Sequence, residues 1–234
     1  MNYQLNNLLK YISTISHYFD QVSFVLLNFI IIFLASEVLA LKEGVNVIWI
    51  LSISALMVTL SSSIIVTPLM VFWSKNREVK SQIFIQSYFG ILILIVLILT
   101  ILSIYAYLNE EVDLNISSFV FMFLYTIYDF CRRSMYVLEN NLIISTVSIL
   151  VLIIFILLIS SVAYFSTVYS SSIFIVGSAA FLLGIITFIF SQIKNYAFEK
   201  FPSAKEFKLI TSNQYSYAKS AIGSSFIIWL VMHG

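Results

Sequence analysis

Three charged residues lie close together in the stretch YDFCRRSMYVLENN, residues 128–141, between two apolar segments. Asp129 precedes Arg132 by three positions and Arg133 by four, and both spacings bring the side chains together on one helix surface. Arginines also bind phosphate oxygens, because each guanidinium offers its donors in a planar fork. Two interpretations follow from these residues alone: an anchor at the cytoplasmic end of a membrane helix, or a phosphate-binding site.

Further polar residues lie in or beside the first long apolar segment. Asp20 and Gln21 stand where this segment begins, and Asn28 lies within it. Gln21 and Asn28 are seven residues apart and therefore share one helix face. Because polar groups are costly in lipid, this pattern indicates a stripe that faces the interior of a helix bundle. The alternative is an interfacial pair together with one amide that bonds a neighbouring helix.

The sequence carries no pattern typical of a catalytic or metal site. Cys131 is the only cysteine, and the two histidines, His17 and His233, lie near opposite ends of the chain. Phosphate-binding glycine loops, zinc-protease motifs and paired cysteines are missing from it. We therefore expect no metal and no cofactor, and we expect that the protein is not an enzyme. A membrane-embedded transferase is the least favoured alternative, because the acidic loop 109–114 offers only a small cluster of carboxylates.

The elements that position these residues follow from the composition. Hydrophobic residues make up 61% of the chain and charged residues 10%, with a mean hydropathy of +1.02. A soluble domain carries about 25% charged residues. Apolar segments of membrane-spanning length recur, and in lipid each must satisfy its own backbone hydrogen bonds as a helix. We predict an all-α integral membrane protein, and the net charge of +1 gives no indication of a nucleic-acid partner.

We predict a six-helix transmembrane bundle, residues 21–193, plus a truncated seventh helix. The spans are expected at 21–41, 47–73, 83–107, 116–131, 142–166, 172–193 and 220–234. Residues 1–20 place apolar side chains at helical spacing, which predicts an amphipathic helix on the cytoplasmic surface. Residues 194–219 are expected to form a cytoplasmic linker. The segment 220–234 is too short for a hydrocarbon core of about 30 Å, so a second half is expected to be missing.

Basic residues are distributed unevenly between the segments that connect the spans. The connecting segments alternate between the two sides of the membrane. The set on the other side from the N-terminus holds only Lys42. The set on the same side as the N-terminus holds the other eleven of the twelve lysines and arginines: Lys10, Lys75, Arg77, Lys80, Arg132, Arg133, Lys194, Lys200, Lys205, Lys208 and Lys219. Cytoplasmic loops of membrane proteins are enriched in lysine and arginine. The distribution therefore predicts a cytoplasmic N-terminus.

Several motifs resemble one family of membrane carriers. They are DQVSFVLLNFIIIFLASEVLALKEG at 20–44, TPLMVF at 67–72 and YDFCRRSMY at 128–136. These motifs are similar to the N-terminal half of bacterial polysaccharide flippases, the O-antigen type branch of the multidrug/oligosaccharidyl-lipid/polysaccharide exporter superfamily. The likeness extends over nearly the whole chain.

The resemblance implies half of an alternating-access transporter in the bacterial inner membrane. It implies a polyprenyl-pyrophosphate-linked oligosaccharide as substrate, with membrane lipid around it and a second half or a second copy of the chain as partner. The substrate-binding residues that it implies are Arg132 and Arg133 at the pyrophosphate, with Asp129 beside them, and Asp20, Gln21 and Asn28 at sugar hydroxyls.

A second class of function also fits the sequence. Small residues such as Ala180 and Gly184 are spaced for close contact between helices. A non-catalytic subunit that packs against other membrane proteins would use such a face. This assembly subunit is the alternative to the flippase.

Overall fold

The computed structural model describes residues 2–75, 80–108, 114–137 and 141–195, together with the single positions Ser212 and Lys219. All regular structure in these ranges is helical, which confirms the all-α prediction for the described chain. The elements in chain order are α1 (Asn2–Glu37), α2 (Leu41–Ser61), the π-helix η1 (Ser62–Val66), α3 (Thr67–Lys75), α4 (Lys80–Leu108), α5 (Ile116–Val137), α6 (Asn141–Phe165) and α7 (Ser170–Asn195).

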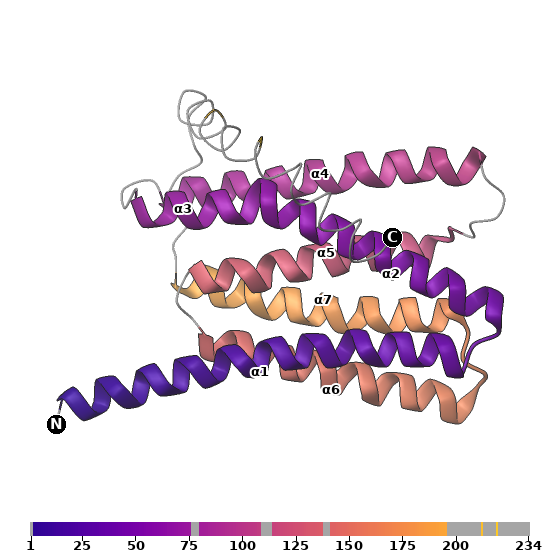
Figure 1. Ribbon diagram of the computed structural model, residues 1–234, viewed down its shortest axis with the longest axis horizontal. Helices are drawn as coiled ribbons and strands as arrows, with labels where there is room; N and C mark the ends of the chain where they lie inside the picture. The colour runs from indigo at the N-terminus through magenta and orange to yellow at the C-terminus, as the bar shows by residue number, and fades with distance from the viewer. Residues whose placement is uncertain are drawn as a thin grey trace.

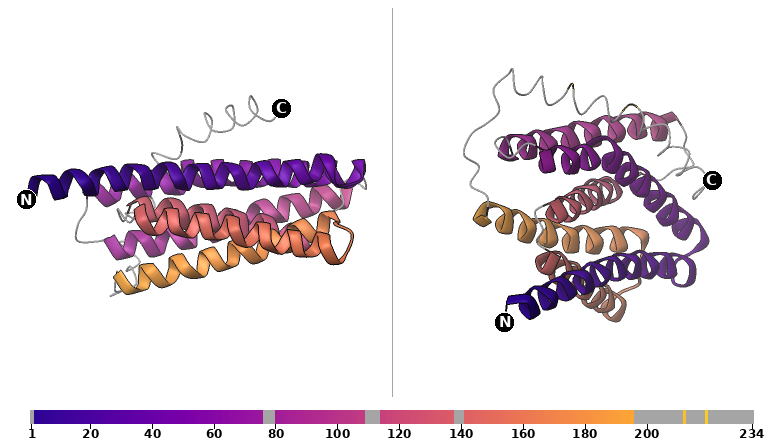
Figure 2. Two further views of the ribbon diagram at one scale, coloured as in Figure 1. Left: turned by 90° about the horizontal axis from the view of Figure 1, so that it is seen from below. Right: turned by 60° about the vertical axis from the view of Figure 1, so that its left-hand side comes forward.

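The helices run back and forth along one long axis, as Figure 1 shows. α6 packs against α1 and α7, and α7 in turn packs against α5. α2 starts beside α1 and crosses the bundle to contact α5 and α4 (Figure 2). α5 therefore lies at the centre, and among residues 116–136 only Ile116 and Val120 have exposed side chains.

Five stretches of the described chain are long and apolar enough to cross a membrane: Ile15–Glu37, Leu41–Val71, Ser87–Ile104, Asn141–Phe165 and Ser170–Ser191. Their outward faces carry large apolar side chains, such as Phe29, Leu97 and Leu157. Exposed apolar surface of this extent is typical of a protein that meets lipid or a partner. These features are those of a multi-pass membrane protein.

The fourth predicted span, residues 116–131, differs in length and in hydropathy from the helix that the structure contains there. α5 continues past the predicted end at Cys131 to Val137, and it is not among the five apolar stretches. Its charged residues lower its hydropathy, so the described chain offers five apolar spans instead of the six predicted. The predicted seventh segment, 220–234, and all but a few positions of the linker 194–219 lie outside the described residues.

The first helix is longer than predicted. α1 runs for 36 residues without a break, so the expected boundary between the interfacial helix 1–20 and the first span falls inside one helix. After a short turn α2 begins at Leu41, close against the end of α1. Gly44 permits this contact, because a Cβ atom there would collide with the carbonyl oxygen of Ala35.

The second long span contains a local change of helix type. The π-helix η1 immediately precedes α3, in which Pro68 is the second residue. Both the backbone N–H and the hydroxyl of Thr67 donate to the carbonyl oxygen of Ser62, the hydroxyl at 2.9 Å. Proline supplies no N–H to the preceding turn, and π-helical turns inside α-helices are frequent at functional sites.

Candidate functional site: a buried ion network

Four charged residues form one connected cluster, here called the ion network: Asp20 of α1 and Asp129, Arg132 and Arg133 of α5. Arg132 donates from Nη1 to Asp20 Oδ2 and from Nη2 to Asp129 Oδ1, each at 2.7 Å. Arg133 Nε donates to Asp129 Oδ2 at 2.6 Å. The pairs within α5 follow from sequence spacing, whereas the link to Asp20 joins positions 112 residues apart. Two carboxylates thus balance two guanidinium groups.

The members of the network differ in exposure. The side chain of Asp20 is 0% exposed, that of Arg132 2% and that of Asp129 3%, whereas that of Arg133 is 35% exposed. Buried charges are tolerated only when opposite charges and hydrogen bonds compensate them. In this arrangement Arg133 is the member of the network that a ligand reaches without a rearrangement of the bundle.

Two hydroxyl groups complete the surroundings of Asp20. Ser148 of α6 donates to Oδ1, and Tyr136 of α5 donates to Oδ2. The Ser148 hydroxyl is also 3.1 Å from that of Tyr128. Sequence reasoning missed these groups, although Tyr136 follows Asp129 by seven positions and therefore shares its helix face. Ser148 lies on another helix and gave no signal in the sequence.

The guanidinium of Arg132 also stacks on an aromatic ring. Its Cζ atom lies 4.2 Å from the centre of the Phe24 ring of α1, within the range of a cation–π contact. Its Nε atom is buried and has no hydrogen-bond acceptor among the described residues. A buried donor without an acceptor costs about 1–3 kcal/mol. The hydrogen bonding of the network is therefore incomplete at this atom.

Arg133 connects the network to the π-helix. Its Nη1 atom donates to the hydroxyl of Ser62 at 3.3 Å. Ser62 is the first residue of η1, the irregular turn that precedes Pro68. The accessible arginine thus touches the one described position where the second long span departs from α-helical geometry.

The structure separates the two amides that the sequence placed in one stripe. Asn28 accepts a hydrogen bond from the hydroxyl of Tyr125 of α5 at 3.1 Å, and its Nδ2 donates to the Phe24 carbonyl at 3.1 Å. Gln21 is exposed. Of the three polar positions predicted in α1, Asp20 and Asn28 therefore point inward, and only the first of them belongs to the ion network.

The ion network lies toward one end of the bundle. Asp20 follows the start of its apolar stretch at Ile15, and Arg132 precedes the end of α5 at Val137. Both positions are within about two helical turns of that end. It is the end predicted to face the cytoplasm, where α1 starts (Figure 1).

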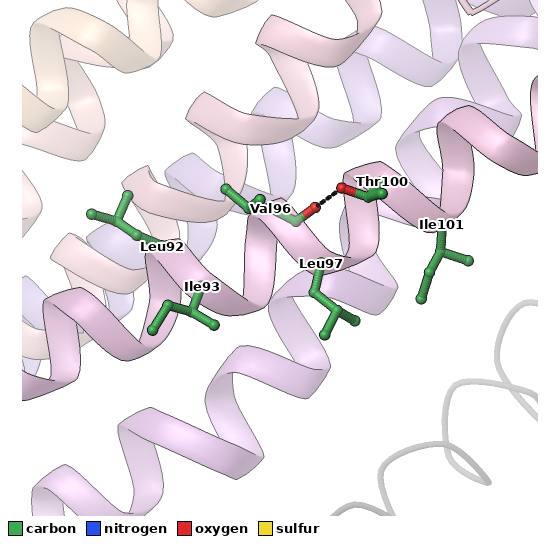
Figure 3. Close-up of a pocket in the computed structure, with 6 residues that line it drawn as sticks. All are labelled: Leu92, Ile93, Val96, Leu97, Thr100 and Ile101. Atoms are coloured by element: carbon green, nitrogen blue, oxygen red, sulfur yellow. Dashed lines mark hydrogen bonds between the residues drawn. The ribbon is translucent and has the colours of Figure 1, made fainter.

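Outside the ion network, the described chain offers an apolar groove but no metal cluster. The groove lies on α4 and is lined by Leu92, Ile93, Val96, Leu97, Thr100 and Ile101 (Figure 3). Its one hydroxyl, that of Thr100, donates to the Val96 carbonyl at 2.7 Å. Such a surface suits a hydrocarbon chain. No group of three or more His, Cys, Asp or Glu residues in the described ranges is placed to hold a metal ion.

The small residues of α7 are used within the chain. A Cβ atom on Gly184 would lie 2.7 Å from Tyr128 Cε2 of α5 and 2.8 Å from Val151 Cγ2 of α6. Ala180 is fully buried. The face that an assembly partner would need at these positions is therefore covered by helices of the same bundle.

Comparisons with known proteins add no relative to this description. No protein-family model matches the chain, and no match is found among curated proteins or among solved structures. The resemblance to polysaccharide flippases stays a prediction from the sequence, and the site is described by its own geometry: a charge-balanced ion network, closed on three members and open at Arg133.

Proposed function

We propose that this chain is a bundle of a membrane carrier that moves a lipid-linked oligosaccharide by alternating access. The ion network carries the proposal. Charged residues are rare inside membrane bundles and mark substrate or ion pathways where they occur. The half-exposed guanidinium of Arg133 suits the oxygens of a pyrophosphate, which arginine binds through two parallel hydrogen bonds.

The proposal includes α5 as a sixth membrane span. Its 22 residues give a helix about 33 Å long, enough for a core of about 30 Å. Its charged groups pair with one another and with α1, so the lipid-facing helices around it supply the apolar surface. On this proposal the N-terminus is cytoplasmic and the membrane is the bacterial inner membrane. A second bundle comes from a further half or a second copy of the chain.

Alternating access gives Asp20 and Asn28 two roles. In the described state both bond to side chains of α5 and hold α1 against it. When the bundle opens toward the cytoplasm, the same oxygen atoms become available to sugar hydroxyls. Gln21, exposed beside them, is placed to contact the glycan at the mouth of the opening.

A transport assay with matched variants tests this function. The purified chain is reconstituted in liposomes that hold a fluorescent polyprenyl-pyrophosphate-linked oligosaccharide, and a membrane-impermeant quencher reports each molecule that crosses. Arg133→Gln is expected to lower the initial rate at least about tenfold, the loss of one charge-assisted contact. Lys42→Gln removes an exposed cation from the other end of the bundle and is expected to leave the rate unchanged. Equal rates for both variants and the unmodified protein, above the rate of protein-free liposomes, would exclude Arg133 as the phosphate contact.

A further inference from the structure

The charges of the ion network balance only while Arg133 stays paired with Asp129. Two carboxylates face two guanidinium groups, and three of the four side chains are no more than 3% exposed. Arg133, at 35%, is open to an incoming group. An anion that binds the Nε side of this guanidinium therefore competes with Asp129 for the same donor.

We infer that binding of a phosphate-bearing anion at Arg133 is linked to the uptake of one proton by Asp129. When the anion replaces Asp129 at Nε, the charge of Arg133 compensates one negative charge of the anion and no longer that of Asp129. Asp20 and Asp129 are then left with Arg132 alone, and a buried uncompensated negative charge is strongly unfavourable. One proton from the aqueous phase, bound to a carboxylate oxygen of Asp129, restores the balance between the two carboxylates and Arg132.

The hydrogen bonds around the two carboxylates decide which of them takes the proton. Asp20 keeps three donors after the exchange, from Arg132, Tyr136 and Ser148. Among the described residues, Asp129 keeps one donor, Arg132. Hydrogen bonds to a carboxylate stabilise its charged form. The proton is therefore bound by Asp129, the carboxylate with fewer donors.

The other ionisable groups that the structure describes near the network are a histidine, a cysteine and tyrosines, and one of the tyrosines, Tyr136, donates to Asp20. They are His17 of α1, Tyr88 of α4, and Tyr125, Tyr128, Cys131 and Tyr136 of α5, while α6, η1 and α7 contribute the uncharged side chains Ser148, Ser62 and Phe188. Histidine is the one of these residue types that normally titrates near neutral pH. His17 is exposed and packs edge-on against Tyr136, with ring centres 5.0 Å apart. His17→Gln therefore serves as a control.

A binding experiment tests the linkage on the full chain in an uncharged detergent. The choice of a pyrophosphate ligand rests on the proposed function, whereas the proton uptake is measured independently of transport. The first probe is a farnesyl-pyrophosphate-linked sugar, and the second is the methyl ester of the same sugar pyrophosphate. Both are diesters, so their own charge is constant between about pH 6 and pH 8. Calorimetry gives the dissociation constant, and repetition in buffers of different ionisation enthalpy gives the number of protons bound.

The unmodified chain is expected to bind about one proton per anion. The dissociation constant of the anion is therefore expected to increase up to about tenfold for each unit by which the pH rises. Asp129→Asn is expected to retain binding and to lose both the proton uptake and the pH dependence. Glu43→Gln removes a carboxylate that accepts a hydrogen bond from the Ser170 N–H, outside the network, and is expected to keep both. Binding of both probes identifies the pyrophosphate as the ligand, and binding of the farnesyl probe alone identifies the lipid-linked form. Each of these two results supports the linkage if proton uptake accompanies the binding.

Binding without proton uptake, at an affinity independent of pH, overturns the inference and leaves the proposed function intact. That result means that Arg133 binds the anion through its remaining donors and keeps Asp129. If neither probe binds, the proposed function fails and the inference fails with it. Because the proton count uses the unmodified chain, the outcome does not depend on whether Asp129→Asn folds.

Discussion

Helices α4 and α5 lie side by side and meet their surroundings in opposite ways. In the most apolar window of α4 only 17% of residues are buried, and its exposed face is a row of large aliphatic side chains. α5 carries three charged residues and is not among the five apolar stretches, but nearly all of its described side chains are covered. The more hydrophobic helix is therefore the less buried one.

The contrast has a physical cause. A helix that faces lipid must be apolar, because lipid offers no hydrogen-bond partners. A helix surrounded by other helices can carry polar groups, provided that its neighbours supply the partners. Asp20 and Ser148 do this for α5, whereas the Thr100 hydroxyl of α4 bonds only within its own helix. Hydropathy thus identifies the helices at the periphery of the bundle better than the one at its centre.

The largest expected effect is on the charges of α5. Arg132→Met leaves Asp20 and Asp129 buried without their shared cation, and we expect it to lower the free energy of unfolding by about 3–5 kcal/mol. Titration with a denaturing detergent, followed by the loss of helical circular dichroism, measures this. Adding Asp20→Asn and Asp129→Asn to the same chain is expected to recover most of the loss. A loss below about 1 kcal/mol would contradict the compensating role of Arg132.

The second prediction concerns the hydrogen bond from Tyr136 to the buried carboxylate of Asp20. Tyr136→Phe removes one donor to a charged group and is expected to cost about 1.5–3 kcal/mol of unfolding free energy. The same unfolding titration measures it. In a background that carries Asp20→Asn, the cost is expected to fall by at least half; an unchanged cost would show that Tyr136 acts through packing instead.

Two glycines test the difference in packing directly. A Cβ on Gly184, where α5 and α6 contact α7, would lie within 3 Å of Tyr128 and Val151, so Gly184→Ala is expected to destabilise by about 1–3 kcal/mol. Among the described residues, the nearest atom to a Cβ on Gly90 of α4 would be Cδ1 of Ile65, at 3.7 Å. Gly90→Ala is therefore expected to stabilise by about 0.5–1 kcal/mol through helix propensity. Changes in stability of the same sign in both variants would contradict the inferred difference in packing around Gly184 and Gly90.

The smallest effect is expected on the exposed face of α4. Thr100→Val removes a hydroxyl that bonds the carbonyl of its own helix, and we expect a change within about 0.5 kcal/mol. Thermal unfolding in detergent micelles and in lipid nanodiscs checks this prediction. A larger loss that occurs only in nanodiscs would mean that Thr100 contacts something more polar than hydrocarbon.

Local patterns in the sequence accounted for part of the site. The spacing of Asp129, Arg132 and Arg133 predicted that they share a helix surface, and their ion pairs within α5 confirm it. The same patterns placed Gln21 with Asn28 as an inward stripe, whereas the structure turns Asp20 inward and leaves Gln21 exposed. Helical periodicity gives the angle between two side chains but not the direction of the helix face toward its neighbours.

The sequence by itself determined the helical class, the apolar stretches and the concentration of charge near one end of α5, because each depends on composition or on spacing within one segment. The tertiary structure decided that Asp20 of α1 and Ser148 of α6 complete this cluster. It also decided that Arg133, unlike Arg132, is open to a ligand. These contacts join residues more than a hundred positions apart, and they depend on the packing of all the helices together.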